Sequence, residues 1–245
     1  MRNKYFYEKL DSTMSEFQRL KELNDQPLVV QAGTQNDGIG RNDHLWLSPP
    51  GGLWFTFDLS LQRSVPSFAL YAGFCVHSCL ERLFAPLRGR LKIKWTNDII
   101  LDGKKLGGIL CRYQSAKHTY TIGIGINTNN VIDPELGKFG AISLKEALGF
   151  EISNHHLCLN LIDSTLNHCN KGLEDMYYLT YCNNHLFGKG HQARLETGGL
   201  TIQAEIISID PSGALLIRKE MGDFVLIHTG SILEIMDYPA VFLDR

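Results

Sequence analysis

The sequence contains no long apolar run, no closely paired cysteines and no cluster of basic residues. Its most apolar stretch, residues 65–80, is interrupted by Ser67, His77 and Ser78, so it is too polar to cross a bilayer. The first residues lack the apolar core of a signal peptide. A net charge of −2 provides no positive field for nucleic-acid phosphates. We therefore expect a protein that binds neither a membrane nor nucleic acid.

The cysteines are scattered along the chain and form no C-x-x-C motif. They are Cys75, Cys79, Cys111, Cys158, Cys169 and Cys182. A cysteine within an apolar or helical stretch is usually a small buried hydrophobe, so we expect reduced thiols and a cytoplasmic location. The adjacent His155 and His156 cannot share one helical face, and no third ligand stands at a zinc-like spacing. The sequence therefore predicts no metal site.

The length of 245 residues suggests one large domain, or a main domain with a small one. Up to residue 187 the patterns predict mixed strands and helices. The strands are expected near 5–10, 27–31, 53–59, 91–95 and 118–127, and the helices near 13–23, 66–84, 144–148 and 153–181. The intervening segment 33–50 is rich in glycine and polar residues, which predicts a long loop.

Beyond Gly188-Lys189-Gly190 the sequence changes to short alternating strands separated by glycine turns. This pattern is typical of a small β-barrel. We therefore predict an α+β protein in which residues 1–187 form the main domain and residues 188–245 a small C-terminal barrel.

A β-hairpin is predicted around Asp102-Gly103, because these residues tolerate the positive φ angles of a type I′ turn. The turn sets Asp98 opposite Gly107 and places Asp98 and Lys105 on one face as diagonal neighbours, roughly 7–8 Å apart. Gly107 and Gly108 then expose backbone that a ligand can approach. An ordinary solvated hairpin with scattered charges is the alternative.

Three further segments contain motifs that are read structurally, functionally or both ways. The glycines of Ile122-Gly123-Ile124-Gly125-Ile126-Asn127 indicate either close backbone packing or the floor of a pocket. Helix capping accounts for Asp11-Ser12-Thr13, with a capping box from Thr13 to Glu16. Gly38-Ile39-Gly40 is a weak dinucleotide motif, since no third glycine follows at the required spacing.

Together these segments resemble the biotin–protein ligases. Residues 94–110 match that family's Lys-Trp-Pro-Asn-Asp and Lys-Leu-Ala-Gly-Ile-Leu, with Thr96 for the usual proline and Gly107 for the usual alanine. Residues 38–49 resemble its biotin-binding loop, Gly-Arg-Gly-Arg-x-Gly-Arg-x-Trp followed by Ser-Pro. The matching positions are Gly38, Gly40, Arg41, Trp46, Ser48 and Pro49, and the departures are Ile39, Asp43 and His44.

The resemblance runs along nearly the whole chain and implies a mixed-sheet biotin/lipoate ligase-type catalytic domain followed by an SH3-like barrel. It implies a biotin–[acetyl-CoA-carboxylase] ligase without an N-terminal DNA-binding domain. Such an enzyme uses ATP, with Mg²⁺, to form biotinyl-5′-AMP, and then transfers biotin to a lysine of a biotin carboxyl carrier domain. Both a monomer and a homodimer are compatible with the resemblance.

The resemblance also implies individual roles. The biotin-binding positions are Ser12, Thr13, Gln35, Gly38, Arg41, Trp46, Lys105, Gly108 and Gly125. The nucleotide-binding positions are Arg41, Trp46, Asn97, Lys105 and Asn127, and the catalytic positions are Arg41, Lys105 and Asp98. The three departures in the loop suggest weaker closure over the intermediate. The alternatives are a lipoate–protein ligase or octanoyltransferase on the same scaffold, and a non-catalytic protein that binds biotin or a carrier.

Overall fold

The computed structural model describes residues 2–62, 64–65, 67–132, 140–173 and 176–236. The chain divides into two compact units. The first comprises residues 1–65, 107–131 and 143–166, and the second comprises residues 66–106, 132–142 and 167–245. Strand β7, Lys104–Gln114, begins in the second unit and continues into the first.

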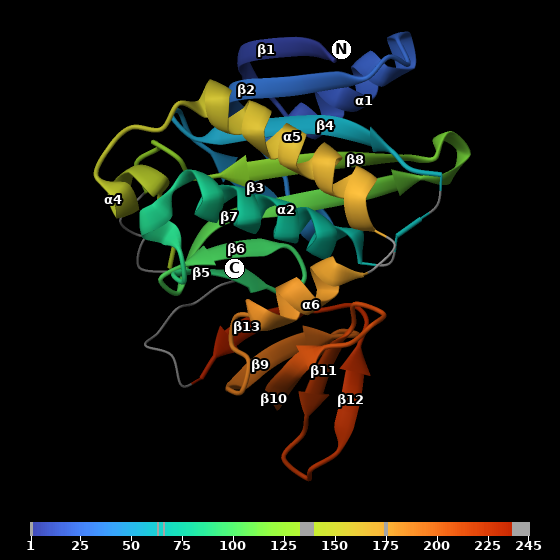
Figure 1. Ribbon diagram of the computed structural model, residues 1–245, viewed down its shortest axis with the longest axis vertical. Helices are drawn as coiled ribbons and strands as arrows, with labels where there is room; N and C mark the ends of the chain where they lie inside the picture. Colours follow the sequence, from blue (N-terminus) through green and yellow to red (C-terminus); the bar gives the residue numbers. More distant parts are fainter. Residues whose placement is uncertain (1, 63, 66, 133–139, 174–175, 237–245) are drawn as a thin grey trace. The chain divides into compact units, whose positions relative to one another are not determined.

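The first unit is built on a mixed sheet whose strands are hydrogen-bonded in the order β1-β2-β4-β8-β7, with β3 paired to β2 (Figure 1). The strands are β1 Asn3–Leu10, β2 Leu28–Ile39, β3 Leu45–Ser48, β4 Leu53–Ser60 and β8 Thr119–Ile126. β1 runs parallel to β2, and the other pairs are antiparallel. Aromatic and β-branched residues favour the central strands, and seven of the eight residues of β4 are buried.

Two helices cover opposite faces of this sheet. Helix α1, Thr13–Leu23, places Phe17 against Leu28 and Val30 of β2. Helix α5, Asn154–Gly172, lies on the face to which Val29 points. Successive side chains of a strand point to opposite faces, so β2 contributes to both cores. The short helix α4, Leu144–Leu148, has the predicted bounds and is capped by Ser143, whose side chain accepts a hydrogen bond from the Glu146 N–H.

The second unit has an apolar helix at its centre. Helix α2, Phe68–Leu83, is buried over most of its surface and contacts β5, Leu91–Lys94, β6, Asp98–Leu101, and α6, Tyr177–Asn184. Its aromatic residues meet those of α6, with edge contacts between Tyr71 and Tyr178 and between Phe74 and Tyr181.

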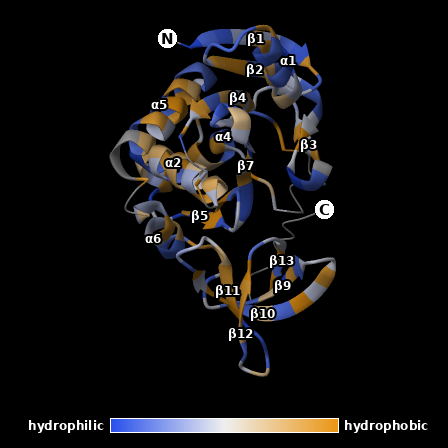
Figure 2. Ribbon diagram, turned by 90° about the vertical axis from the view of Figure 1, so that its right-hand side faces the viewer, coloured by the Kyte–Doolittle hydropathy of each residue, from blue (hydrophilic) through white to orange (hydrophobic). Residues whose placement is uncertain are grey.

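The same unit contains a five-stranded antiparallel sheet of order β12-β11-β10-β9-β13. Its strands are β9 Gln192–Thr197, β10 Leu200–Ile209, β11 Leu215–Arg218, β12 Phe224–Ile227 and β13 Ser231–Ile235. Figure 2 shows hydrophilic and hydrophobic residues alternating along β10, as expected for a sheet with one solvated face. The α+β class and the separate small C-terminal β sheet are confirmed, while the boundary at residue 187 stays a prediction.

Several local predictions were wrong. The loop predicted at 33–50 is ordered, because β2 continues to Ile39 and pairs with β3 after the 3₁₀ turn η1, Arg41–Asp43. The helix predicted at 153–181 is two helices, and Met176 adopts a positive φ at the start of α6. Strand β13 was missed, and the predicted helix start at Pro66 lies outside the described residues.

Two further 3₁₀ turns, η2 Ala85–Leu87 and η3 Ser115–Lys117, connect neighbouring elements. All six cysteines are free thiols, as predicted. Among the described residues, no helix is both long and apolar enough to cross a membrane.

Candidate functional site

Three glycines, Gly108, Gly123 and Gly125, leave backbone exposed on the face of the first sheet that carries α1. We call this surface the glycine strip. Gly125 of β8 lies between Trp54 of β4 and Gly108 of β7, and Gly123 lies opposite Thr56. Directly paired residues share a face, so these glycines expose the sheet surface where other strands would present side chains. Gly108 and Gly125, both expected to bind biotin, are thus paired on one face, while their role stays a prediction.

Two side chains from other elements, Met14 of α1 and Trp46 of β3, lie on this strip. A Cβ added to Gly123 would stand 2.9 Å from the Met14 sulfur, and one added to Gly125 would stand 2.6 Å from Trp46 Nε1. The Trp46 indole also meets Trp54 edge-on, with ring centroids 6.4 Å apart. A larger residue at either position would have to displace the neighbouring side chain, the flexible Met14 at Gly123 and the Trp46 indole at Gly125.

A polar network surrounds the N-terminus of α1. Gln35 accepts a hydrogen bond from the Thr13 N–H at 2.7 Å and donates one to Ser48 Oγ at 2.6 Å. The Thr56 hydroxyl donates to Thr13 Oγ1 at 2.9 Å. Strand β2 therefore caps this helix through Gln35, which satisfies an N–H that helix termini leave without an intrahelical partner.

This arrangement corrects the predicted caps. Ser12 occupies the N-cap position but makes no side-chain capping bond. The capping box from Thr13 is also wrong, because Glu16 instead accepts hydrogen bonds from Tyr7 and Arg19. The Arg19 guanidinium holds the pKa of Glu16 below its usual value.

The Ser12 hydroxyl is the group in this network that lacks a hydrogen bond in the described residues. The residue is 3% exposed, its Oγ is fully buried, and within the described part of the chain no hydrogen-bond partner reaches that atom. A buried hydroxyl without a partner is costly, by about 1–3 kcal/mol. Such an atom is therefore a candidate ligand contact.

The segment between β2 and β3 forms a tight ribbon. Gly38 pairs with Trp46, and a Cβ at Gly38 would collide with the Trp46 carbonyl oxygen. Arg41 is half-buried and begins η1 at the tip of the ribbon, where its carbonyl accepts a hydrogen bond from the His44 N–H. Hydrogen bonds between β2 and β3 thus order this segment, although its composition predicted a loop.

Polar residues gather where β8 ends. Asn127 accepts the Leu144 N–H through its carbonyl at 2.9 Å, and its Oδ1 accepts from Asn130 at 3.0 Å. Asn130 is 3% exposed, and its Oδ1 has no hydrogen-bond partner in the described residues. Sequence reasoning missed Asn130, for which the run Asn127-Thr128-Asn129-Asn130 was the available signal, and it gave Ser48 no role beyond the family match.

The second unit contains the charged hairpin. Asp102 and Gly103 have φ angles of 50° and 78°, which confirms a turn with positive φ at both positions. Asp98 Oδ2 lies 3.1 Å from Lys105 Nζ and 3.6 Å from Lys94 Nζ. The predicted neighbourhood of Asp98 and Lys105 is confirmed, and Lys94 joins it as a third member.

The three charged side chains differ in how far they are buried. The side chains of Lys94 and Asp98 are 2% and 8% exposed, whereas that of Lys105 is 26% exposed. The buried carboxylate thus neutralises one ammonium group inside the fold and orients a second one that reaches solvent. Asn97 lies in the turn before β6, and the Trp95–Thr96 peptide bond in the same turn is cis.

A cavity of about 490 Å³ lies elsewhere in the first unit, between β1, β2 and α5. Its lining is mostly apolar, with Val29, Cys158 and Ile162 among the lining residues. None of the predicted site residues lines it. We place the candidate site on the glycine strip because the unsatisfied polar groups and bare backbone lie there.

A model of the biotin/lipoate A/B protein ligase family matches residues 6–129. The chain belongs to this family. The matched segment contains every residue of the predicted site, from Ser12 to Asn127, and the strands β2 to β8.

The chain is also similar to individual ligases of the family in sequence and in structure. The chain is 29% identical to the bifunctional ligase/repressor BirA of Bacillus subtilis over 232 residues, 89% of this chain and 70% of that protein. It is 31% identical to BirA of Bacillus spizizenii over 79% of this chain, but spans only 62% of that relative. The biotin protein ligase of Aquifex aeolicus, solved with biotin and ATP, matches with a TM-score of 0.81 at 27% identity, covering 94% of this chain and 97% of that one.

Proposed function

We propose that this protein is a biotin–protein ligase that joins biotin to a lysine of a carrier domain through biotinyl-5′-AMP. The observation that carries the proposal is the polar network at the N-terminus of α1, in which the buried Ser12 hydroxyl lacks a partner beside the glycine strip. The Aquifex ligase, which was solved with biotin and ATP, supports the choice of both substrates.

The biotin head group suits this network chemically. Its ureido ring is neutral and offers one carbonyl oxygen and two N–H groups, which need matched donors and acceptors in a dry pocket. Ser12, Thr13 and Gln35 supply hydroxyl and amide groups of both kinds. Gly108 and Gly125 would let the bicyclic ring lie flat on the backbone.

Trp46 has to move for that placement, because its indole now contacts Gly125. Its short strand, β3, pairs with the C-terminal part of β2, and the register shifts between Gln35 and Gly38. We assign Trp46 to covering the bound acid and nucleotide, and Gly38 to keeping β2 and β3 close enough for that cover.

Positively charged side chains are expected to stabilise the transition state of the first half-reaction. A carboxylate oxygen of biotin bonds to the α-phosphorus of ATP, the bond from this phosphorus to the bridging oxygen breaks, and pyrophosphate leaves. Two anions meet in this step, so positioned positive charge is the main requirement for catalysis. Arg41 can bind oxygens through two N–H groups, while Lys105 supplies a point charge that Asp98 orients at 3.1 Å.

The nucleotide enters as its magnesium complex, so Mg²⁺ is part of the substrate. Asp98 is not assigned as its ligand, because this carboxylate already lies within 3.6 Å of two ammonium groups. Asn97 and Asn127 provide amide groups for the nucleotide, from the turn before β6 and the end of β8.

The second half-reaction uses the mixed anhydride. The neutral amine of a carrier lysine attacks the acyl carbon, the bond to the phosphate oxygen breaks, AMP leaves and the amine loses a proton. The acceptor is proposed to be a biotin carboxyl carrier domain, as the name of the 26% identical Paracoccus denitrificans biotin–[acetyl-CoA-carboxylase] ligase suggests.

Biotin-dependent exchange between ATP and labelled pyrophosphate tests the first half-reaction. Lys105→Ala should lower the exchange rate by roughly 10²–10³-fold, the usual cost of removing one preorganised charge-stabilising group. Lys104→Ala is the matched control, since the adjacent side chain points to the other face of β7 and its loss should leave the rate within about twofold.

Near-normal exchange by Lys105→Ala would contradict the assignment of this residue. Replacing biotin by lipoate tests the substrate, because the family includes both kinds of ligase. Exchange with lipoate and none with biotin would overturn the proposed function. A biotin-sized mass increase of a carrier domain, lost when its acceptor lysine is changed, tests the second half-reaction.

A further inference from the structure

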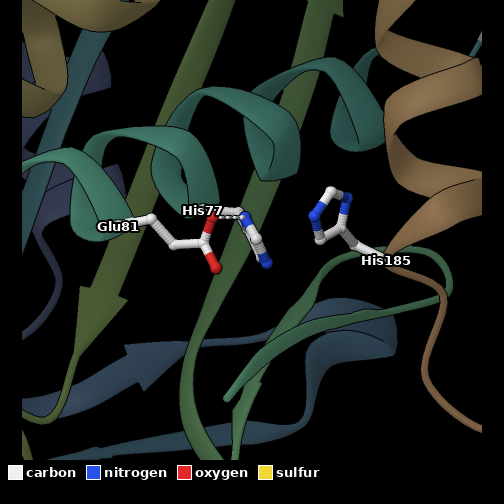
Figure 3. Close-up of side chains that lie close together, drawn as sticks. All are labelled: His77, Glu81 and His185. Atoms are coloured by element: carbon white, nitrogen blue, oxygen red, sulfur yellow. Dashed lines mark ion pairs between the residues drawn. The ribbon is translucent and has the colours of Figure 1, made fainter. Parts of the chain in front are cut away.

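A cluster of two histidines and a glutamate lies in the second unit, outside the site described above. His77 and Glu81 are one helical turn apart on α2, and His185 follows the last residue of α6. One possible ligand atom from each side chain lies within 4.8 Å of the other two. Figure 3 shows the His77 ring between Glu81 and His185, with a ring nitrogen of His185 turned toward it.

Backbone carbonyls fix which nitrogen of each imidazole carries a proton. His77 Nε2 lies 3.1 Å from the Leu91 carbonyl oxygen, and His185 Nδ1 lies 2.9 Å from that of Tyr181. A carbonyl oxygen only accepts, so both of these nitrogens donate. In the neutral rings, His77 Nδ1 and His185 Nε2 therefore keep their lone pairs. Burial lowers the pKa of His77 below its ordinary value, which favours the neutral ring.

The glutamate is held in the same manner. The Gly89 N–H donates to Glu81 Oε1 at 2.9 Å, while Oε2 lies 4.0 Å from His77 Nδ1. Each prospective ligand thus has an outer partner that fixes its orientation. Bonds from a histidine N–H to a backbone carbonyl are the usual outer shell of a protein metal site.

We propose that His77 Nδ1, His185 Nε2 and Glu81 Oε2 bind a divalent transition-metal ion, with Zn²⁺ favoured by the ligand set. Two imidazoles and one carboxylate are a known three-residue zinc ligand set that leaves a fourth position for water. Bond lengths of about 2.0–2.2 Å require tetrahedral ligand atoms roughly 3.3 Å apart, so the present spacing must contract by about 1 Å.

Glu81 is 19% exposed whereas His77 is fully buried, so the contraction would come mainly from rotation of the Glu81 and His185 side chains. The Tyr181 hydroxyl, 2.9 Å from His77 Nδ1, would give up that hydrogen bond to the metal. Its ring, stacked on His185 with centroids 4.2 Å apart, can remain in place.

The ion would link α2 to the end of α6, and through His185 indirectly to β5. His185 is joined to β5 because its carbonyl oxygen accepts the Ile93 N–H at 2.9 Å, and the other two ligands belong to α2. An ion that binds only the folded chain would therefore raise the stability of this unit. This site is independent of the proposed ligase reaction.

The full chain, treated with EDTA and kept under a phosphine reductant, is titrated with ZnCl₂ alone and with CoCl₂ alone. We expect one tightly bound ion, a tetrahedral cobalt spectrum without a thiolate charge-transfer band, and a higher unfolding temperature with Zn²⁺. His185→Gln and Glu81→Gln should each weaken binding at least tenfold. The double variant His155→Gln/His156→Gln, which removes two exposed histidines, should bind as the wild type does.

Equal affinity of the wild type and His185→Gln, a thiolate band, or loss of binding in the control variant would each overturn the proposal. His77 is fully buried, so it is left unchanged in order that folding is preserved. Circular dichroism and pyrophosphate exchange by the two ligand variants show whether they remain folded. A failed ligase assay with intact zinc binding, or the reverse, separates this inference from the proposed function.

Discussion

Replacing Ser12 by alanine should have opposite effects on stability and on biotin binding. Ser12 stands at the N-cap of α1, where a capping serine usually contributes about 0.5–2 kcal/mol to stability. Its hydroxyl makes no capping bond, and the described residues provide no other partner for this buried atom. The alanine variant without ligand should therefore be as stable as the wild type, or more stable by up to about 1 kcal/mol.

Biotin binding should respond in the other direction. If the Ser12 hydroxyl bonds the ureido ring, its loss removes about 1–3 kcal/mol, which raises the Kd for biotin by a factor of roughly 5 to 150. Urea unfolding of the free protein measures the first effect, and calorimetric titration with biotin measures the second.

Ser143 provides a matched control. It is also an N-cap serine and equally buried, at 4% exposed against 3% for Ser12, but its side chain accepts the Glu146 N–H. Ser143→Ala should lower stability by about 0.5–2 kcal/mol and leave the biotin Kd unchanged. A loss of more than about 1 kcal/mol in Ser12→Ala, with unchanged biotin affinity, would refute the reasoning and make Ser12 a structural cap.

Three further outcomes follow from the same geometry. Asp98→Asn removes the carboxylate that neutralises the buried Lys94 ammonium at 3.6 Å, so urea unfolding should show a loss of about 3–5 kcal/mol; a loss below 1 kcal/mol would contradict the pairing. Gly38→Ala forces a methyl group into the Trp46 carbonyl oxygen, so stability should fall by about 1–3 kcal/mol and the biotin Kd should rise, as calorimetry can check. Burial raises the pKa of the Cys182 thiol, so iodoacetamide should leave it unmodified in the native protein and label it in urea, a difference that peptide mass spectrometry resolves.

The local part of the site was predictable because it depends on short-range chemistry. The Asp102-Gly103 turn predicted a hairpin, and the strand register of that hairpin predicted that Asp98 and Lys105 are neighbours. The alternating glycines of β8 likewise indicated a bare strand face, since side-chain direction in a strand has a period of two.

Other predictions failed where partners distant in sequence decide the outcome. Residues 33–50 have the composition of a loop, but pairing of β2 with β3 supplies the backbone hydrogen bonds that order them. The cap of α1 was misassigned because Gln35, 22 positions from Thr13, takes the role expected of Ser12. Capping rules consider neighbours in sequence and cannot anticipate a side chain from another strand.

The sequence by itself determined the α+β class, the family-like motifs, the turn at Asp102-Gly103 and the free thiols, because these follow from local propensity, spacing and composition. Tertiary structure alone decided that Lys94 shares Asp98 with Lys105, that Ser12 Oγ is buried without a partner among the described residues, and that His185 meets His77 and Glu81. The physical reason is that burial and long-range contacts determine the free energy of burying each polar group. Both depend on which elements the fold packs together.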